Sequence, residues 1–315
     1  MISLSRIPYW AYCRGQEKFS SMRWMLGSQP DRIFEEITKV KPSDIKSLSG
    51  EGQNNQSWYV RHKQKEYKLF RLLYEQYSDQ ICQLTKRLQR SGLIMPQFIG
   101  SDKTKSYIVS EWVSGRTIKP SDVAGNPDVL KQIAKLQANT NSIDDFVPSV
   151  KHEDFFYLNK IIIPRYLYWT TVRFGGKLQD INCRIIDSIK KRLGSIQKNR
   201  KMVITNPDFS LNNLIYSDSG DVVVIDTEFM AVDRGADLEM ANFLNKLKRI
   251  SPDIEHKYIE YYESYRPLEQ FHQERDFWDA CITLRHLGKQ AKYLRVNENH
   301  LWRGINRLQE VFCDV

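Results

Sequence analysis

The sequence predicts an α+β protein with two lobes, a small β-rich N-terminal lobe and a larger α-helical C-terminal lobe. Strand-like alternation with turn signals dominates residues 41–114, whereas helical spacing dominates residues 115–315. The 315 residues also exceed the roughly 250 to 300 at which a single hydrophobic core usually stops growing. We therefore expect an N-terminal extension over 1–40, an N-lobe over 41–114 and a C-lobe over 115–315.

Composition excludes several classes of protein. Residues of the types AVILMFWYC make up 41% and charged residues 27%, as in ordinary globular proteins. No apolar run approaches the ~18 residues of a membrane-spanning helix, and the first residues lack the pattern of a signal peptide. Five scattered cysteines without a CxxC pair, and six histidines without metal-ligand spacing, argue against a zinc or cysteine-nucleophile enzyme. We expect a cytoplasmic protein without a transmembrane segment.

The first part of the chain shows mainly strand signals. Residues 1–40 carry aromatic and basic residues without a clear period, and we expect them to pack on the main body as an extension. Residues 57–61 and 67–71 are rich in β-branched and aromatic residues and follow a Gly/Asn-rich loop at 49–55, which predicts an antiparallel sheet. A helix from about Ser78 and a strand at 107–109 complete the predicted N-lobe.

The remainder is mainly helical. Apolar residues recur at helical spacing near 129–136 and 185–196. Two short strands joined by a turn at 218–220 follow a strand at 202–205, and Ser251-Pro252 predicts the cap and first turn of a later helix. Seven Lys or Arg residues against one Asp in 184–201 are mostly expected to form the solvated face of a helix.

The most informative residues are Asp208, Asn213 and Asp226. Asp208 precedes Asn213 by five residues, and Asp226 ends the apolar strand that follows. Phosphoryl transfer needs one carboxylate to orient the acceptor hydroxyl, and an amide oxygen with a second carboxylate to hold Mg²⁺. The alternative is a polar hairpin turn in which Asp208 caps the turn and Asp226 only ends a strand.

These residues resemble the aminoglycoside phosphotransferase and choline kinase superfamily, small-molecule kinases with a protein-kinase-like fold. The family's loop HGDxxxxN corresponds here to 206–213, and its hydrophobic-hydrophobic-Asp motif ends at Asp226. The resemblance implies a bilobal kinase-like fold, Asp208 as the catalytic residue, and Asn213 and Asp226 as metal ligands. Glu228 is a further candidate at the metal or acceptor end. Residues 234–240 are similar to fructosamine-kinase-like members, in which Asp237 would brace the catalytic loop.

The resemblance also implies a nucleotide site in the N-lobe. Residues 107–118 are similar to the family's interlobe linker, with Gly115 at the crossover. The linker residues expected to receive the adenine of ATP are Ser110, Glu111, Trp112 and Val113. Gly50 and Gly52 would lie in the turn that covers the nucleotide, although a simple hairpin turn is the competing interpretation.

A strand cation should hold the phosphates. Leu69 and Arg71 share one face of their strand because alternate residues do so, and Arg71 fits the family position best, with Lys68 as the competitor. A surface-exposed strand cation is the competing interpretation. For the acidic partner of the cation, Glu75 and Asp79 both remain candidates.

The chain departs from the family at three positions. Asn206 and Pro207 replace the customary His and Gly of the catalytic loop, and Gln137 stands where many relatives have His. A proline fixes φ and removes a backbone donor, so the departure also favours an alternative, a nucleotide-binding pseudokinase or scaffold.

We expect an ATP- and Mg²⁺-dependent phosphotransferase that transfers the γ-phosphoryl group to a hydroxyl of a small molecule, such as a sugar or amino sugar. The net charge of +9 favours a neutral or anionic acceptor over choline or an aminoglycoside. It also favours a basic nucleic-acid-binding protein as a further alternative, but no recognisable reading module supports one. We expect no nucleic-acid partner; the sequence leaves the acceptor and the oligomeric state open.

Overall fold

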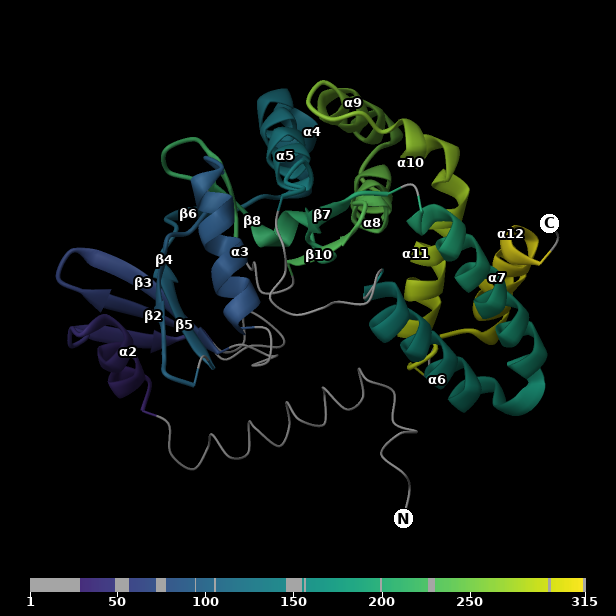
Figure 1. Ribbon diagram of the computed structural model, residues 1–315, viewed down its shortest axis with the longest axis horizontal. Helices are drawn as coiled ribbons and strands as arrows, with labels where there is room; N and C mark the ends of the chain where they lie inside the picture. The colour runs from purple at the N-terminus through teal and green to yellow at the C-terminus, as the bar shows by residue number, and fades with distance from the viewer. Residues whose placement is uncertain are drawn as a thin grey trace, which may run out of the picture.

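The computed structural model describes residues 29–48, 57–71, 78–93, 95–104, 106–145, 155, 157–198, 200–225, 230–293 and 296–313, with the backbone alone at 78–81 and 197. An antiparallel sheet near the N-terminal end of this range lies beside a large helical part (Figure 1). The predicted α+β architecture is confirmed. The boundaries at residues 40 and 114 stay predictions.

The N-terminal sheet has five strands in the order β1-β2-β3-β5-β4, and every pair is antiparallel. They are β1 (Asp44–Ser47), β2 (Ser57–His62), β3 (Lys65–Arg71), β4 (Phe98–Ser101) and β5 (Tyr107–Glu111). In the β3–β5 register Lys68 lies opposite Ser110, and Leu69 lies opposite Val109. Residues of odd and even number in β3 therefore belong to opposite faces of the sheet.

Each face of this sheet packs against a different helix. Leu69 and Val109 pack with Phe34 of α2 (Pro30–Thr38) in a cluster of N-lobe residues. Ile108 lies on the other face with the helix α3 (Ser78–Arg90). The buried α3 residues Leu84 and Leu88 belong to the core of the helical part. The α3 face is therefore the one turned toward the C-terminal half of the chain.

Helix α2 lies within the segment that we expected to form an extension. Its Phe34 is fully buried, so this part of residues 1–40 contributes to the core of the sheet. Pro30 lies in the first helical turn, where proline is a common start signal. Residues 1–28 lie outside the described residues.

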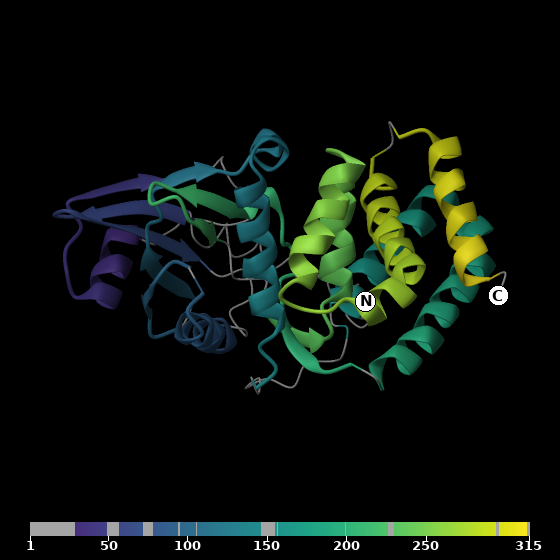
Figure 2. The same cartoon turned by 90° about the horizontal axis from the view of Figure 1, so that it is seen from above.

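The helical part is built around one large core (Figure 2). Its α-helices are α4 (Pro120–Gly125), α5 (Pro127–Asn141), α6 (Ile163–Phe174), α7 (Gln179–Gln197), α8 (Asp237–Lys248), α9 (Pro252–Glu263), α10 (Glu269–Gln273), α11 (Arg275–Gln290) and α12 (Glu298–Phe312). A π-helical segment, Tyr157–Ile162, leads into α6, and the 3₁₀ turn Gly175–Leu178 leads into α7.

Two small sheets position the loop of interest. Strand β7 (Met202–Thr205) pairs with β10 (Ala231–Arg234), and β8 (Leu214–Ser217) pairs with β9 (Val222–Val224) and β6 (Gly115–Thr117). The 3₁₀ turn Leu211–Asn213 precedes β8. Gly115 has φ +145°, and a Cβ there would lie 2.4 Å from the Tyr216 carbonyl oxygen, so this pairing needs a glycine.

Several local predictions are confirmed. Ser251 caps α9 by accepting a hydrogen bond from the Asp253 N–H, and the hairpin turn lies between β8 and β9. Lys190 and Lys191 of α7 are exposed, as expected for a solvated face, whereas Arg200 is buried. Within the described residues, no helix is long and apolar enough to span a membrane.

Candidate active site

The loop between β7 and β8 brings Asp208 and Asn213 together. The Asn213 side-chain amide donates to the Asp208 carbonyl oxygen at 3.0 Å and to its carboxylate Oδ2 at 3.3 Å. The Asp208 N–H donates to Asn206 Oδ1 at 3.1 Å, which closes a tight turn at the carboxylate. The Asp208 side chain is 41% exposed. A substrate hydroxyl can therefore reach a carboxylate whose orientation is already set.

The same loop offers oxygen ligands of the kind that Mg²⁺ prefers. Because Asn213 Nδ2 donates to Asp208, the remaining amide oxygen Oδ1 is the atom available to a cation. The Ile225 N–H donates to the Asn213 carbonyl oxygen at 2.9 Å, so the residue before Asp226 lies beside Asn213. Asp226 and Glu228 themselves lie outside the described residues. The described donor atoms fit a hard cation.

A buried carboxylate, that of Glu239 in α8, packs against this loop and is hydrogen-bonded to it. Its Oε2 accepts a hydrogen bond from the Asn206 N–H, and its Oε1 accepts from Gln137 Nε2 at 2.5 Å. Gln137 in turn accepts from the Tyr258 hydroxyl. Burial raises the pKa of Glu239 to about 7. Asn206 and Gln137, two positions at which the chain departs from the family pattern, are thus joined through one side chain.

Asp237 has a different position from the one expected. Its two carboxylate oxygens accept hydrogen bonds from the Arg200 guanidinium at 3.0 and 3.1 Å, and Arg200 also pairs with Glu274 at 2.7 Å. Burial raises the pKa of Asp237, against the effect of Arg200. Among the described carboxylates, Glu239 contacts the loop between β7 and β8, whereas Asp237 anchors the chain just before β7.

Helices α8 and α11 place polar side chains against the catalytic loop. The Pro207 carbonyl oxygen lies 3.4 Å from Asn242 Nδ2 and 3.5 Å from Arg285 Nη1, and Lys246 Nζ donates to the Phe209 carbonyl oxygen at 3.0 Å. Burial, followed by the charge of Arg285, lowers the pKa of Lys246 to about 8. The carbonyl oxygen of Pro207 therefore still receives hydrogen bonds, although its nitrogen has no proton to donate.

The expected adenine-binding linker follows β5. The Glu111 N–H donates to the Gln97 carbonyl oxygen at 2.8 Å, and the Trp112 N–H donates to the Glu66 carbonyl oxygen at 3.0 Å. Among the described residues, no backbone carbonyl accepts a hydrogen bond from the Val113 N–H. Ser110 is buried and Glu111 is exposed. Within the segment 110–113, Val113 is thus the residue best placed to offer a backbone donor to a ligand.

The two candidate strand cations, Arg71 and Lys68, lie on opposite faces of the N-terminal sheet. Arg71 lies on the α2 face of the sheet, with its guanidinium carbon 5.9 Å from the Tyr107 ring centroid. That face is turned away from the catalytic loop. Lys68 lies on the α3 face, opposite Ser110. This placement favours Lys68 over Arg71 for a contact with phosphates, and that contact stays a prediction.

Other predicted residues cannot be placed. Gly50 and Gly52 lie outside the described residues, as do Glu75 and the side chain of Asp79.

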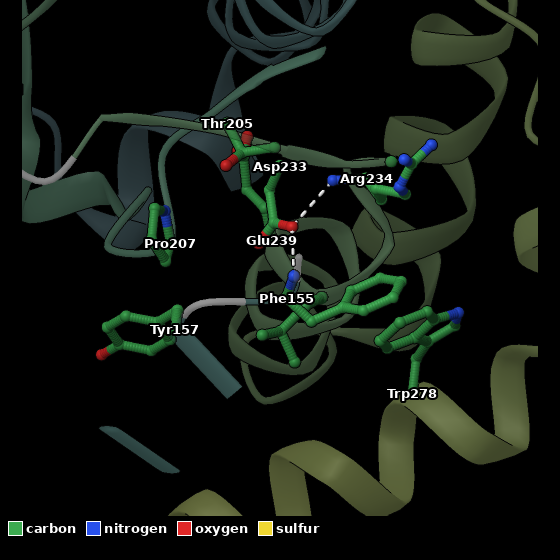
Figure 3. A pocket seen from close by; sticks show the side chains of 10 residues that line it. Phe155, Tyr157, Thr205, Pro207, Asp233, Arg234, Glu239 and Trp278 are labelled. Atoms are coloured by element: carbon green, nitrogen blue, oxygen red, sulfur yellow. Dashed lines mark hydrogen bonds between the residues drawn. The ribbon is translucent and has the colours of Figure 1, made fainter. Parts of the chain in front are cut away.

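A pocket that the sequence did not indicate adjoins the catalytic loop (Figure 3). Asp233 lies at its centre, where Oδ1 accepts from the Phe155 N–H at 2.6 Å and from the Arg234 N–H at 2.7 Å. Pro207 and Glu239 also line the pocket. These residues come from segments that are distant in the chain, so no local pattern in the sequence could have revealed the pocket.

Comparison with known proteins supports the fold. No protein-family model and no curated protein matches the sequence. Choline kinase LicA from Streptococcus pneumoniae matches 90% of this chain over 100% of its own, with 15% identity and a TM-score of 0.63. The streptomycin–ATP–APH(2″)-IIa ternary complex matches 90% of this chain over 97% of its own, with 15% identity and a TM-score of 0.61.

A fructosamine-3-kinase candidate from Haemophilus somnus 129PT covers 88% of this chain and 96% of its own, with 13% identity and a TM-score of 0.59. At these identities the matches show the fold, which is that of small-molecule kinases and phosphotransferases. The fold implied by the sequence resemblance is confirmed.

Proposed function

We propose that this protein is an ATP-dependent kinase that transfers the γ-phosphoryl group to a hydroxyl of a small molecule. The observation that carries the proposal is the Asp208–Asn213 pair, held in one loop of a chain with a small-molecule-kinase fold. A partly exposed carboxylate next to an amide oxygen is the arrangement that orients a hydroxyl beside Mg²⁺ and phosphates.

Each residue has a defined task in this proposal. Asp208 orients the acceptor hydroxyl and accepts its proton, and Asn213 with Asp226 holds Mg²⁺. The metal, when bound, neutralises the charge of the phosphate oxygens. Val113 N–H receives the adenine, and Lys68 contacts the phosphates. The ATP complex of a structural neighbour agrees with nucleotide use.

The test is an ATP-consumption screen across classes of hydroxyl acceptor, with Asp208→Ala as the blank. We expect turnover with at least one acceptor class and a loss of about 1,000-fold or more in Asp208→Ala, because general-base and orienting effects are both removed. Asp226→Ala should lose Mg²⁺-dependent nucleotide binding as well as turnover. Full activity in either variant would refute the assignment.

A pseudokinase is the second candidate, because Asn206-Pro207 replaces the usual residues of the loop. It predicts that ATP raises the melting temperature but that no acceptor is phosphorylated. Against it, Asn206 makes two contacts that organise the loop: its side chain accepts from the Asp208 N–H and its own N–H donates to Glu239.

A further inference from the structure

A buried cation, Arg285 of α11, lies beside the proposed catalytic residue. The residue is only 5% exposed, and its Nη2 lies 3.6 Å from Asp208 Oδ1. Its Nη1 lies 3.5 Å from the Pro207 carbonyl oxygen. Both terminal nitrogens of the guanidinium are therefore directed at the catalytic loop.

The hydrogen-bonding capacity of Arg285 is largely unused. At 3.6 Å the contact with Asp208 is an ion pair and not a hydrogen bond, and 3.5 Å to Pro207 is the outer limit of one. In the part of the chain that the structure describes, the buried Nε has no hydrogen-bond partner. Buried charged groups normally have their donors satisfied, so an unpaired donor needs an explanation, such as a bound ion or a catalytic role.

Further cations lie near Lys246 and His286, two side chains that sense the charge of Arg285. Burial lowers the pKa of His286 to about 4, and the charges of Arg249, Arg285, Lys289 and Lys246 lower it in the same direction. The depressed pKa of Lys246 has Arg285 as its second cause after burial. An anion placed here would relieve this repulsion, whereas a cation would add to it.

We propose that the acceptor carries an anionic group, a carboxylate or a phosphate, which binds Arg285 beside Asp208. This inference rests on the proposed kinase function, because it places the acceptor at Asp208. The planar guanidinium suits two parallel hydrogen bonds to either kind of anion. The short distance between Arg285 and Asp208 requires the hydroxyl and the anionic group to be a few bonds apart. The acceptor is thus a compact hydroxy acid or hydroxy phosphate.

Tyr157 contacts the Arg285 guanidinium. Its ring centroid lies 5.3 Å from the Arg285 guanidinium carbon, and the tyrosine also lines the pocket beside Pro207 (Figure 3). The guanidinium carbon lies over the aromatic ring, so an anion would approach from the opposite side, where the half-exposed Asp208 lies.

The test is direct binding, which needs no turnover. The full chain, saturated with ADP and Mg²⁺, is titrated by calorimetry with glycerate, glycerol 3-phosphate, glycerol and choline, so that compounds of related size differ in charge. We expect one or both anionic probes to bind at millimolar concentration or better, and glycerol and choline to bind more weakly. Arg285→Met should weaken binding of the anionic probe by about 10- to 100-fold, with little change for glycerol.

Two further variants control this experiment. Arg303→Met removes the same charge from the exposed face of α12 and should leave all affinities unchanged. Arg285→Lys keeps the positive charge but loses the planar, two-pronged guanidinium, and should lose part of the anion affinity. If ADP does not raise the melting temperature of Arg285→Met, that variant is unfolded, and Arg285→Lys takes its place in the test.

Equal or tighter binding of glycerol or choline, no binding of either anion, or unchanged anion affinity in the Arg285 variants would overturn the inference. The proposed function fails separately: Arg285-dependent anion binding without phosphate transfer to any acceptor would leave the anion site in place and refute the kinase. A kinase that prefers neutral acceptors would refute only the anion site.

Discussion

Replacement of Glu239 by Gln should make the stability of the protein less sensitive to pH. Glu239 is buried and accepts hydrogen bonds from Gln137 and from the Asn206 N–H. Burial raises its pKa from 4.5 to about 7. At 1.36 kcal/mol for each pH unit, the fold disfavours the ionised form by roughly 3 kcal/mol.

The direction of this pH dependence follows from proton linkage. The folded state keeps the proton of Glu239 up to about pH 7, whereas the unfolded chain releases it above about pH 4.5. The contribution of Glu239 to the free energy of unfolding is therefore lost as the pH rises from 4.5 to 7, and it stays small at higher pH. Between pH 5 and pH 8 the calculated loss is about 2.5 kcal/mol. Glutamine cannot ionise, but its NH₂ group takes the place of one of the two oxygens that accept hydrogen bonds, so one of these bonds is lost at every pH.

The assay is urea unfolding of both proteins at pH 5 and pH 8. We expect the free energy of unfolding of wild type to fall by about 2.5 kcal/mol more than that of Glu239→Gln between pH 5 and pH 8, on top of a loss in the variant that is the same at both pH values. Glu310→Gln, which changes an exposed carboxylate of α12, should follow wild type at both pH values. A difference between Glu239→Gln and wild type that is the same at both pH values would refute the reasoning.

Three other changes test the lobes and their connection. Lys68→Met should lower kcat/KM for ATP by about 100-fold while Arg71→Met stays close to wild type, and the reverse order would show that the faces of β3 are assigned wrongly. Gly115→Ala should destabilise the protein by about 2 kcal/mol in urea unfolding, because its φ is +145° and the new Cβ meets backbone atoms; unchanged stability would contradict that conformation. Arg200→Met should cost about 3–5 kcal/mol, because it leaves the buried Asp237 carboxylate without its partner. A loss below about 1 kcal/mol in that variant would indicate that Asp237 is satisfied by other groups.

Local signals in the sequence were sufficient for the elements that surround the catalytic loop. The apolar strands on either side of the 218–220 turn, the cap at Ser251 and the helix near 185–196 all appear where the pattern predicts them. Asp208 and Asn213 are five residues apart, so their meeting in one turn is also encoded locally. The overlooked helix α2 had a weaker signal, because Phe34 shows its role only once the sheet packs on it.

The side of the sheet on which Lys68 and Arg71 lie could be seen only in the tertiary structure. The alternation of residues in β3 predicts that Leu69 and Arg71 lie on one face of the sheet and Lys68 on the other. It does not predict which of the two faces is turned toward the C-terminal half of the chain. That is decided by α3, whose Leu84 and Leu88 pack into the large core.

The sequence by itself thus determined the order of the elements, the fold class and the pair Asp208–Asn213, because these depend on residues close together in the chain. Only the tertiary structure decided that Glu239 supports the loop and that Arg285 lies next to Asp208. Arg285 is 78 residues from Pro207, whose carbonyl oxygen it contacts. Contacts between residues so far apart in the sequence depend on how the helices pack. A buried charged side chain can be recognised as a candidate binding site only when the structure shows which of its hydrogen-bond donors are unpaired.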